Sequence, residues 1–131
     1  MAIQYSTTHR TNAMAQLNTD IGINAQIILY SGLAPANVAA APTGTLLVQF
    51  AGNTGGFGVA AEAVLTASAV ASVTATNPGI PGYFRINTSG GTGIVQGTCG
   101  TIGTDMILTA ASVTAGQTCN FTSLTVTAFG V

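Results

Sequence analysis

Few residues of this chain could carry acid–base or nucleophilic chemistry. The 131 residues include two basic side chains, three acidic ones and one histidine. A nucleophile that needs a neighbouring base would have to use His9, and the arrangement that can be drawn is Cys99 with His9 and Asp105. No local signature such as a strained nucleophile elbow supports it, and His9 fits a partly exposed polar residue in the first turn of a helix. The sequence therefore predicts no catalytic residues and a protein that is not an enzyme.

The sequence also lacks the residue patterns of a catalytic carboxylate pair, a metal site or a cofactor site. A glycoside hydrolase needs two carboxylates a short distance apart, whereas Asp20, Glu62 and Asp105 fall in separate predicted elements. Zinc needs clustered cysteine and histidine ligands, and a calcium loop needs several oxygen donors at alternating positions. The glycine-rich stretch 52–58 (GNTGGFG) lacks the lysine and the strand–loop–helix context of a phosphate-binding loop, which favours a surface turn. We expect no metal and no cofactor.

The two cysteines, Cys99 and Cys119, lie in neighbouring predicted strands, so a disulfide between them is geometrically possible. The first ten residues, MAIQYSTTHR, have no basic side chain before Arg10 and lead into no continuous apolar run, unlike a signal peptide. We therefore expect a chain that is not secreted and that stays in a reducing compartment. Two small buried thiols are the favoured interpretation.

The charge content excludes two classes of partner. Charged residues make up 4% of the chain, against roughly 25% in ordinary soluble domains. The two cations are Arg10 and Arg85, whereas nucleic-acid binding needs several basic side chains on one face. The most apolar stretch, 57–73, is shorter than the ~20 residues that cross a bilayer, and it contains Glu62. We expect neither nucleic acid nor a membrane as a partner.

One helix is predicted, near the start of the chain. Ser6 can accept a backbone N–H of the first turn as an N-cap. Met14, Leu17 and Ile21 follow at spacings of three and four residues, so they share one face. Gly22 stands where helices commonly end in the left-handed conformation. The pattern predicts a short amphipathic helix that ends near residue 20 and packs that face on a sheet rather than on a partner.

The rest of the chain has the pattern of short strands separated by turns. The predicted strands lie at 24–30, 45–50, 83–87, 94–98, 102–109 and 118–129, with two short strands or one long bent one within 59–75. The predicted loops lie at 34–44, 51–58 and 76–82. The segments 83–87 and 94–98 should pair as a hairpin. The apolar phase of the last strand slips between Phe121 and Leu124, which predicts a bulge or a change of packing partner.

Short strands at close, turn-punctuated spacing favour an all-β fold, namely an antiparallel β-sandwich or jelly-roll-like domain. The helix adds one short N-terminal amphipathic element to it. Length favours a single domain over 1–131, in which 1–22 form an arm and the helix and 23–131 form the β-sandwich.

The low charge also predicts how the protein is used. A freely soluble monomer normally keeps like-charge repulsion over its surface. This chain must cover itself with Thr, Ser, Asn, Gln, Gly and Ala, whose polar groups lose less than ionised groups when a partner displaces water. Such a surface suits permanent packing, so we expect a component of a large assembly that also forms homo-oligomers. A monomeric domain that tolerates low charge is the alternative.

Four segments carry a resemblance to a known group of proteins. They are MAIQYS at the start, APANVAAAPTGTLL, PGYFRI and IVQGT, in that order. In these segments the chain resembles small proteins encoded among the virion genes of tailed bacteriophages, which are structural components of the head or the tail. The resemblance implies a virion protein that is assembled in the host cytoplasm, and composition favours a cement or decoration protein of the head. Its partners would be the major capsid protein, or tail subunits, and its own copies.

Two other functions stay open at this point. One is a tail-tube or tail-tip component, which would share the neutral β-rich surface but form rings or helical stacks. The other is a small-ligand or carbohydrate-binding β-sandwich module, which would present a cluster of exposed aromatic side chains.

Candidate partner contacts come from the predicted arm and loops, because loops carry recognition more often than the scaffold does. The segments are 1–8, 33–43, 51–58 and 76–82. The candidate contact residues are Ile3, Tyr5, Pro35, Asn37, Pro42, Asn53, Phe57, Pro78, Ile80 and Pro81.

Overall fold

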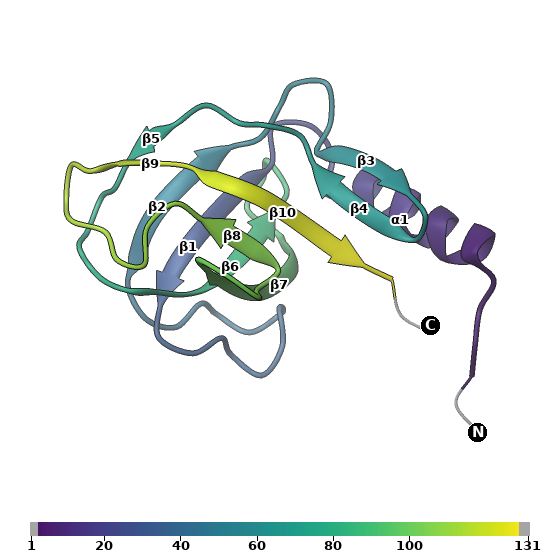
Figure 1. The fold of residues 1–131 in the computed structure, drawn as a ribbon, viewed down its shortest axis with the longest axis horizontal. Helices are drawn as coiled ribbons and strands as arrows, with labels where there is room; N and C mark the ends of the chain where they lie inside the picture. The colour runs from purple at the N-terminus through teal and green to yellow at the C-terminus, as the bar shows by residue number, and fades with distance from the viewer. Residues whose placement is uncertain (1–2, 129–131) are drawn as a thin grey trace.

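In the part of the chain that the structure describes, one α-helix, α1 (Thr7–Ile21), is followed by β-structure (Figure 1). The structure, a computed structural model, describes residues 3–128. Ser6 is the N-cap, and its hydroxyl oxygen accepts the backbone N–H of His9 at 3.2 Å. The helix ends at Gly22, whose φ of 75° places it in the left-handed region where glycine is favoured. The predicted start and end of the helix are both confirmed.

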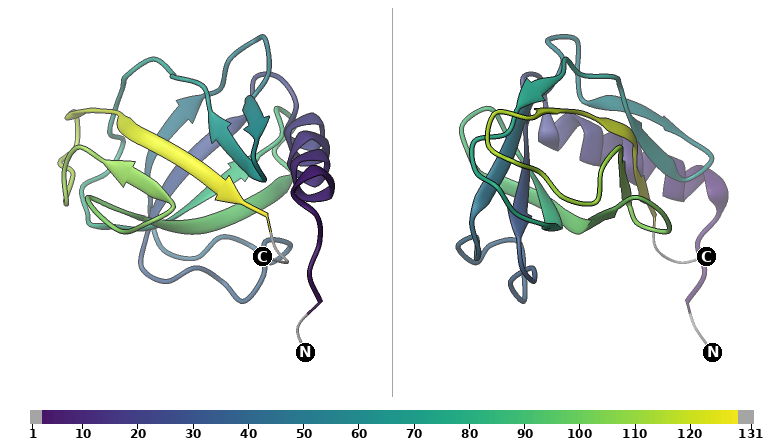
Figure 2. Two further views of the ribbon diagram at one scale, coloured as in Figure 1. Left: turned by 45° about the vertical axis from the view of Figure 1, so that its right-hand side comes forward. Right: turned by 60° about the vertical axis from the view of Figure 1, so that its left-hand side comes forward.

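Within residues 3–128, ten strands follow the helix. They are β1 (Gln26–Ser31), β2 (Leu46–Ala51), β3 (Gly58–Ala61), β4 (Val64–Ala67), β5 (Val73–Thr74), β6 (Pro81–Asn87), β7 (Gly93–Gly100), β8 (Met106–Leu108), β9 (Thr118–Cys119) and β10 (Phe121–Thr127). Eight of them form one sheet in the order β2-β1-β6-β7-β8-β10-β4-β3, and β5 pairs with β9 as a separate ribbon. The large sheet curls on itself, and α1 lies along β3 and β4 (Figure 2).

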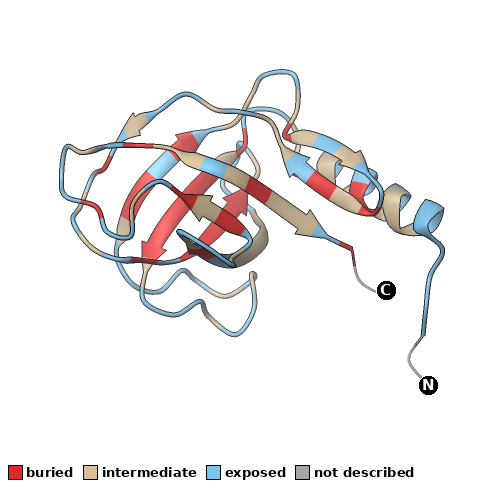
Figure 3. Ribbon diagram, in the orientation of Figure 1, coloured by how far each residue is buried: buried red, intermediate tan, exposed pale blue. Residues whose placement is uncertain are grey.

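The concave side of this curled sheet holds the main hydrophobic core. Figure 3 shows buried residues along the central strands and exposed residues along the loops. Phe50 of β2 packs edge-on against Phe121 of β10, with ring centroids 5.3 Å apart and an interplanar angle of 86°. Met14 and Ile21 join the same cluster from α1, and Leu17 packs against it. The predicted apolar stripe of the helix is therefore core, and each fully buried large side chain stabilises the fold by about 1.5–3 kcal/mol.

The coarse prediction of a β-rich chain behind one helix is confirmed, and so is the hairpin. β6 and β7 pair antiparallel, with Arg85 opposite Gln96. A wholly antiparallel sheet is wrong, because β7 and β8 run parallel. The reason lies in Asp105: its carboxylate accepts the backbone N–H and the hydroxyl of Thr98, each at 3.1 Å, which folds the short connection back beside β7. The description as a sandwich or jelly roll stays a prediction.

The segment 59–75 differs from its prediction in detail. It forms three short strands, and a tight turn at Glu62 and Ala63, with φ of 48° and 67°, separates the first two. The alternating apolar positions predict a buried face throughout, yet Ala69 and Ala71 are exposed. An alanine methyl buries little area, so alternation carried mostly by alanine does not hold a strand on the core.

The strands predicted at 102–109 and 118–129 are also shorter than expected. Only β8 forms in the first, and Ile102 is 85% exposed in the turn before it. The second divides at Asn120 into β9, which pairs with β5, and β10, which pairs with β8 and β4. The register shift between Phe121 and Ser123 confirms the predicted irregularity. Phe129 lies outside the described residues.

Side-chain amides cover both edges of the curled sheet. At the β2 edge, Asn77 donates its amide N–H to the carbonyl of Leu46 at 2.8 Å, beside a backbone bond from Thr76 to Leu47. At the β3 edge, the Asn18 side chain takes the place of a neighbouring strand. Its Nδ2 donates to the Gly58 carbonyl and its Oδ1 accepts the Gly58 N–H, both at 3.0 Å. This covering by α1 blocks pairing of β3 with another chain at that point.

The Asn18 contact gives a first prediction. Asn18→Ala removes both hydrogen bonds and leaves the partly buried Gly58 groups without a partner, so it should lower the free energy of unfolding by about 1–3 kcal/mol. Urea unfolding followed by circular dichroism measures the change. Asn12→Ala is the matched control, because Asn12 is exposed on the same helix. Equal effects of the two substitutions would contradict the edge-covering role.

Candidate interaction surfaces

The residues considered for nucleophilic chemistry lie in unlike environments. His9 is exposed on the first turn of α1 and stacks on Tyr5, with ring centroids 5.2 Å apart. Cys99 is buried in β7, and the Asp105 carboxylate is engaged by Thr98. Over residues 3–128 no group of three or more His, Cys, Asp or Glu side chains comes together as a metal site would require.

The two cysteines are buried as free thiols, as the sequence predicts. Burial raises the pKa of the Cys99 thiol from 9.0 to about 11. Burial also raises the pKa of Cys119, while a backbone contact at Ala75 acts in the opposite direction. A thiol with a raised pKa holds little thiolate at neutral pH, so Cys99 is the reverse of an activated nucleophile.

The Cys99 thiol gives a prediction about pH. The thiol ionises near pH 9.0 in the unfolded chain and near pH 11 in the folded one, so its contribution to stability is complete below pH 9.0 and is lost as the pH rises towards 11. The free energy of unfolding should therefore fall over this range, and it should fall less steeply in Cys99→Ala. Urea unfolding at a series of pH values tests this. Superimposable pH profiles for the two proteins would rule it out.

The three carboxylates lie in separate places. Asp20 accepts the side-chain amide of Gln16 at 2.9 Å near the end of α1, Glu62 lies exposed in the β3–β4 turn, and Asp105 precedes β8. The glycine-rich segment 52–58 is an ordered turn. Asn53 donates its side-chain N–H to the Ala69 carbonyl at 2.8 Å and accepts the backbone N–H of Asn24 with its own carbonyl.

The ten candidate contact residues divide by burial. Six are exposed: Ile3, Tyr5, Asn37, Pro42, Pro78 and Ile80. Pro35 and Asn53 are partly buried and bond within the chain. The prediction that Phe57 and Pro81 face a partner is corrected, because both are buried. Phe57 enters the main core, and Pro81 begins β6 opposite Ser31 of β1.

The loop 33–43 is attached to the outer face of the sheet by one buried cation. Arg85 of β6 is only 3% exposed. Its Nη1 donates to the Ala40 carbonyl and its Nη2 to the side-chain oxygen of Gln96, both at 2.9 Å. Gln96 in turn donates to the Pro35 carbonyl at 2.8 Å. The Ala40 carbonyl and the Gln96 side chain thus replace part of the water that the buried guanidinium loses, while its Nε is buried without a partner among the described residues.

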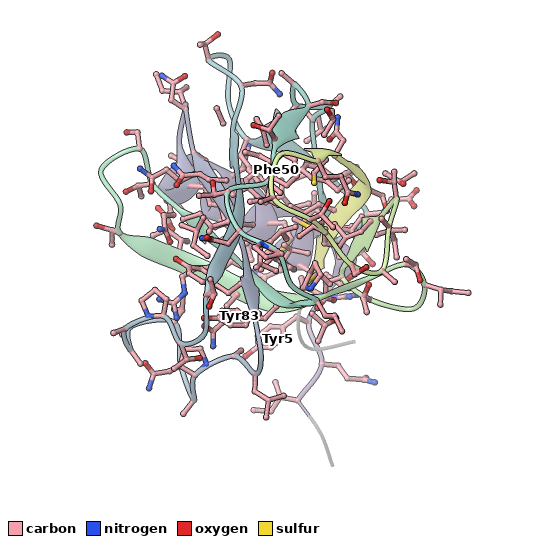
Figure 4. All side chains as sticks on the ribbon, turned by 90° about the vertical axis from the view of Figure 1, so that its left-hand side faces the viewer. Tyr5, Phe50 and Tyr83 are labelled. Atoms are coloured by element: carbon pink, nitrogen blue, oxygen red, sulfur yellow. The ribbon has the colours of Figure 1, made fainter. Side chains whose placement is uncertain are left out.

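A tyrosine pair attaches the other end of the same loop. The Tyr83 hydroxyl donates to the Thr43 carbonyl at 2.7 Å and accepts the Thr43 N–H at 2.9 Å. Its ring stacks on Tyr30 at 5.1 Å, and with Ile28 and Leu46 these rings form a second, smaller hydrophobic cluster. Figure 4 shows Tyr83 on the side of the sheet where the loop lies, away from Phe50. The loop is therefore held in one shape before any partner arrives.

Sequence reasoning missed this attachment. An arginine inside the predicted strand 83–87 indicates a solvent-facing position, and nothing in the spacing of Arg85 and Gln96 indicates a covering loop. The available signal is the predicted hairpin itself, which places Arg85 and Gln96 opposite each other.

We predict that Gln96→Ala frees the loop from the sheet. The substitution leaves an Arg85 donor and the Pro35 carbonyl without their partner, at a cost of about 1–3 kcal/mol. Amide hydrogen exchange should rise across 35–43 while the core strands keep their protection. Gln49→Ala is the matched control, because Gln49 is an exposed position of β2. Unchanged exchange across the loop would show that Gln96 does not hold it.

Large apolar side chains remain exposed on several parts of the surface. The most exposed are Leu33 (89%), Ile102 (85%), Ile3 (74%) and Ile80 (71%). Leu33 and Ile80 lie at the same end of the sheet, because the β1–β6 pairing ends at Ser31 and Pro81. Leu33 begins the predicted contact segment 33–43. Ile102 is an addition to the candidate contacts, since the sequence places it in a strand.

Comparisons with protein-family models, with curated proteins and with solved structures gave no match. Within residues 3–128 the structure has no helix with the length and apolar character of a membrane span. The function is therefore inferred from the surfaces described above.

Proposed function

We propose that this chain is a structural protein of a tailed-bacteriophage virion, specifically a cement or decoration protein of the capsid. It acts without catalysis, by binding the major capsid lattice and neighbouring copies of itself and so holding adjacent subunits together. The observation that carries this proposal is an almost uncharged surface on which large apolar side chains stand exposed.

The physical reason is the cost of removing water. An ionised side chain is expensive to desolvate, whereas a hydroxyl, an amide or an aliphatic side chain is not, provided that its polar atoms find partners. Covering an exposed side chain such as Leu33 or Ile80 contributes up to about 1.5–3 kcal/mol each. Repeated over many copies on a shell, such modest contacts give a permanent attachment.

The attached loop 33–43 supports the proposal further. A loop already fixed by Arg85 and Tyr83 loses little conformational entropy when a partner covers it. Its exposed residues, among them Leu33, Asn37 and Pro42, then present a defined shape to a capsid subunit. Shape complementarity between neutral surfaces is what a cement protein needs.

The proposal predicts that attachment does not depend on salt. Salt screens interactions between charges. This chain has two basic and three acidic side chains, besides one histidine. The number of copies of the protein bound to purified capsids should stay constant from low salt to about 1 M. At that ionic strength the Debye length is about 3 Å, so interactions between exposed charges are largely screened. Quantitative gel analysis of sedimented particles measures it, and circular dichroism at each salt concentration controls for unfolding. Wholesale release by moderate salt would argue against the mechanism.

Electron cryo-microscopy of the mature particle tests the location directly. Density for the chain over the capsid lattice is the expected result. Density in rings or helical stacks along the tail would replace the capsid assignment by the tail assignment. Its absence from both parts would overturn the proposal.

A further inference from the structure

Two buried polar atoms lie on the outer face of the sheet, on strand β6. Arg85 is 3% exposed and Asn87 is 8% exposed. The Nε of Arg85 and the Oδ1 of Asn87 are both buried, and neither has a hydrogen-bond partner among residues 3–128. Buried polar atoms in native proteins are nearly always hydrogen-bonded, either to the protein or to ordered water. Two such atoms in one strand therefore indicate a bound partner.

The two atoms have complementary chemistry and a matching spacing. The guanidinium Nε–H is a donor, whereas the amide Oδ1 is an acceptor. Arg85 and Asn87 are two positions apart in β6, so their side chains leave the same face of the strand about 6.6 Å apart. One hydrogen bond from nitrogen and one from a water oxygen, placed in series, span about 5.7 Å. A single water molecule between Nε and Oδ1 therefore fits both the chemistry and the spacing.

The backbone of the loop 33–43 closes over this position. Gly93 of β7 lies opposite Asn87 of β6. A Cβ atom at Gly93 would lie 3.0 Å from the carbonyl oxygen of Val38 and 3.5 Å from the Cδ atom of Arg85. The missing side chain at Gly93 thus lets the loop backbone come close to the sheet beside Arg85, whose Nε is bonded to that Cδ. The Val38 carbonyl supplies a second acceptor at the same place.

We propose that this chain binds one water molecule beneath the loop 33–43, between Arg85 and Asn87. The water oxygen accepts the Nε–H of Arg85. One hydrogen of the water is donated to the Oδ1 of Asn87 and the other to the Val38 carbonyl. Buried waters typically make about three hydrogen bonds to polar groups that are otherwise unsatisfied. The water joins the loop to the sheet at a third point, besides the contacts of Arg85 with Ala40 and of Gln96 with Pro35.

Water fits this site better than an anion does, although the buried guanidinium carries a positive charge. The printed partners of Arg85, the Ala40 carbonyl and the Gln96 side chain, are both neutral. An anion could accept the Nε–H, but it would also face the Oδ1 of Asn87, which is an acceptor with a partial negative charge. Water both accepts and donates, so it satisfies the two atoms at once. A carboxylate from another molecule would have to displace the loop, because Arg85 is 3% exposed.

This inference goes beyond the proposed function and does not depend on it. The water site belongs to the folded chain by itself, whichever partner the loop contacts. Its tests therefore use the purified chain alone, and their outcome leaves capsid attachment to be decided by its own experiments.

A high-resolution crystal structure of the purified chain tests the site directly. The expected result is one isolated density peak within about 2.7–3.2 Å of both the Arg85 Nε and the Asn87 Oδ1. A second crystal, grown with bromide in place of chloride, separates water from a halide ion through the anomalous signal of bromine. No anomalous peak is expected at the site. An anomalous peak there would assign the site to an anion, and a direct bond between Nε and Oδ1 would leave no place for the water; either result overturns the proposal.

Nuclear magnetic resonance tests the same site in solution. The chain has two arginines, Arg10 and Arg85, so the Nε–H signals are few and can be assigned by substitution. The Arg85 Nε–H should show cross-peaks to water with opposite signs in laboratory-frame and rotating-frame Overhauser spectra, which distinguishes a bound water from proton exchange. Asn87→Leu should lose these cross-peaks, because it removes the acceptor. Asn12→Leu is the control, since Asn12 is exposed on α1, and it should keep them.

The natural protein alone decides the matter if Asn87→Leu does not fold. Cross-peaks to water that are missing from the Arg85 Nε–H of the natural protein overturn the proposal. So do cross-peaks that persist unchanged in a folded Asn87→Leu variant, because the water would then not be held by Asn87.

Discussion

The whole structure depends on satisfying backbone polar groups with very few ionic side chains. A curled sheet leaves unpaired N–H and C=O groups at its edges and under its loops, and each one buried without a partner costs about 1–3 kcal/mol. Where a side chain supplies the partner, it is mostly a neutral amide or hydroxyl. Asn18 takes the place of a strand at β3, Asn77 does so at β2, and Tyr83 serves a loop N–H and its carbonyl at once. Arg85 is the one buried charge among the described residues.

This constraint links the fold to the proposed role. Amides and hydroxyls satisfy most of the backbone groups that need a side-chain partner. The fold therefore needs few charged side chains, and the surface can be almost neutral. The same chemistry that completes the edges inside one copy can complete contacts between copies. The attached loop 33–43 is one example, because the backbone groups of Pro35, Ala40 and Thr43 already have partners within the chain.

Local signals in the sequence predicted the local structure well. Ser6 and Gly22 define the helix because capping is a property of a few neighbouring residues, and the glycine turn defines the β6–β7 hairpin for the same reason. What the sequence did not predict depends on distant contacts. The covered Arg85 follows from a loop more than forty residues before it. The parallel β7–β8 pair is a different case, because the Asp105–Thr98 bonds beside it join residues only seven positions apart and no pattern of residue types announces them. The alternation of apolar residues predicted burial wrongly at Ala69 and Ala71, which are exposed. Burying an alanine methyl gains too little free energy to hold this segment on the core.

The position of β10 has a consequence for how the protein is made. This strand, near the C-terminus, joins the part of the sheet that contains β2, β1, β6, β7 and β8 to the hairpin of β4 and β3. Helix α1, which precedes every described strand in the chain, packs on that hairpin. A nascent chain therefore holds two unconnected parts of the sheet until β10 has been synthesised. Folding of the complete sheet waits for β10 and depends on contacts between segments far apart in the chain, and such contacts make folding slow.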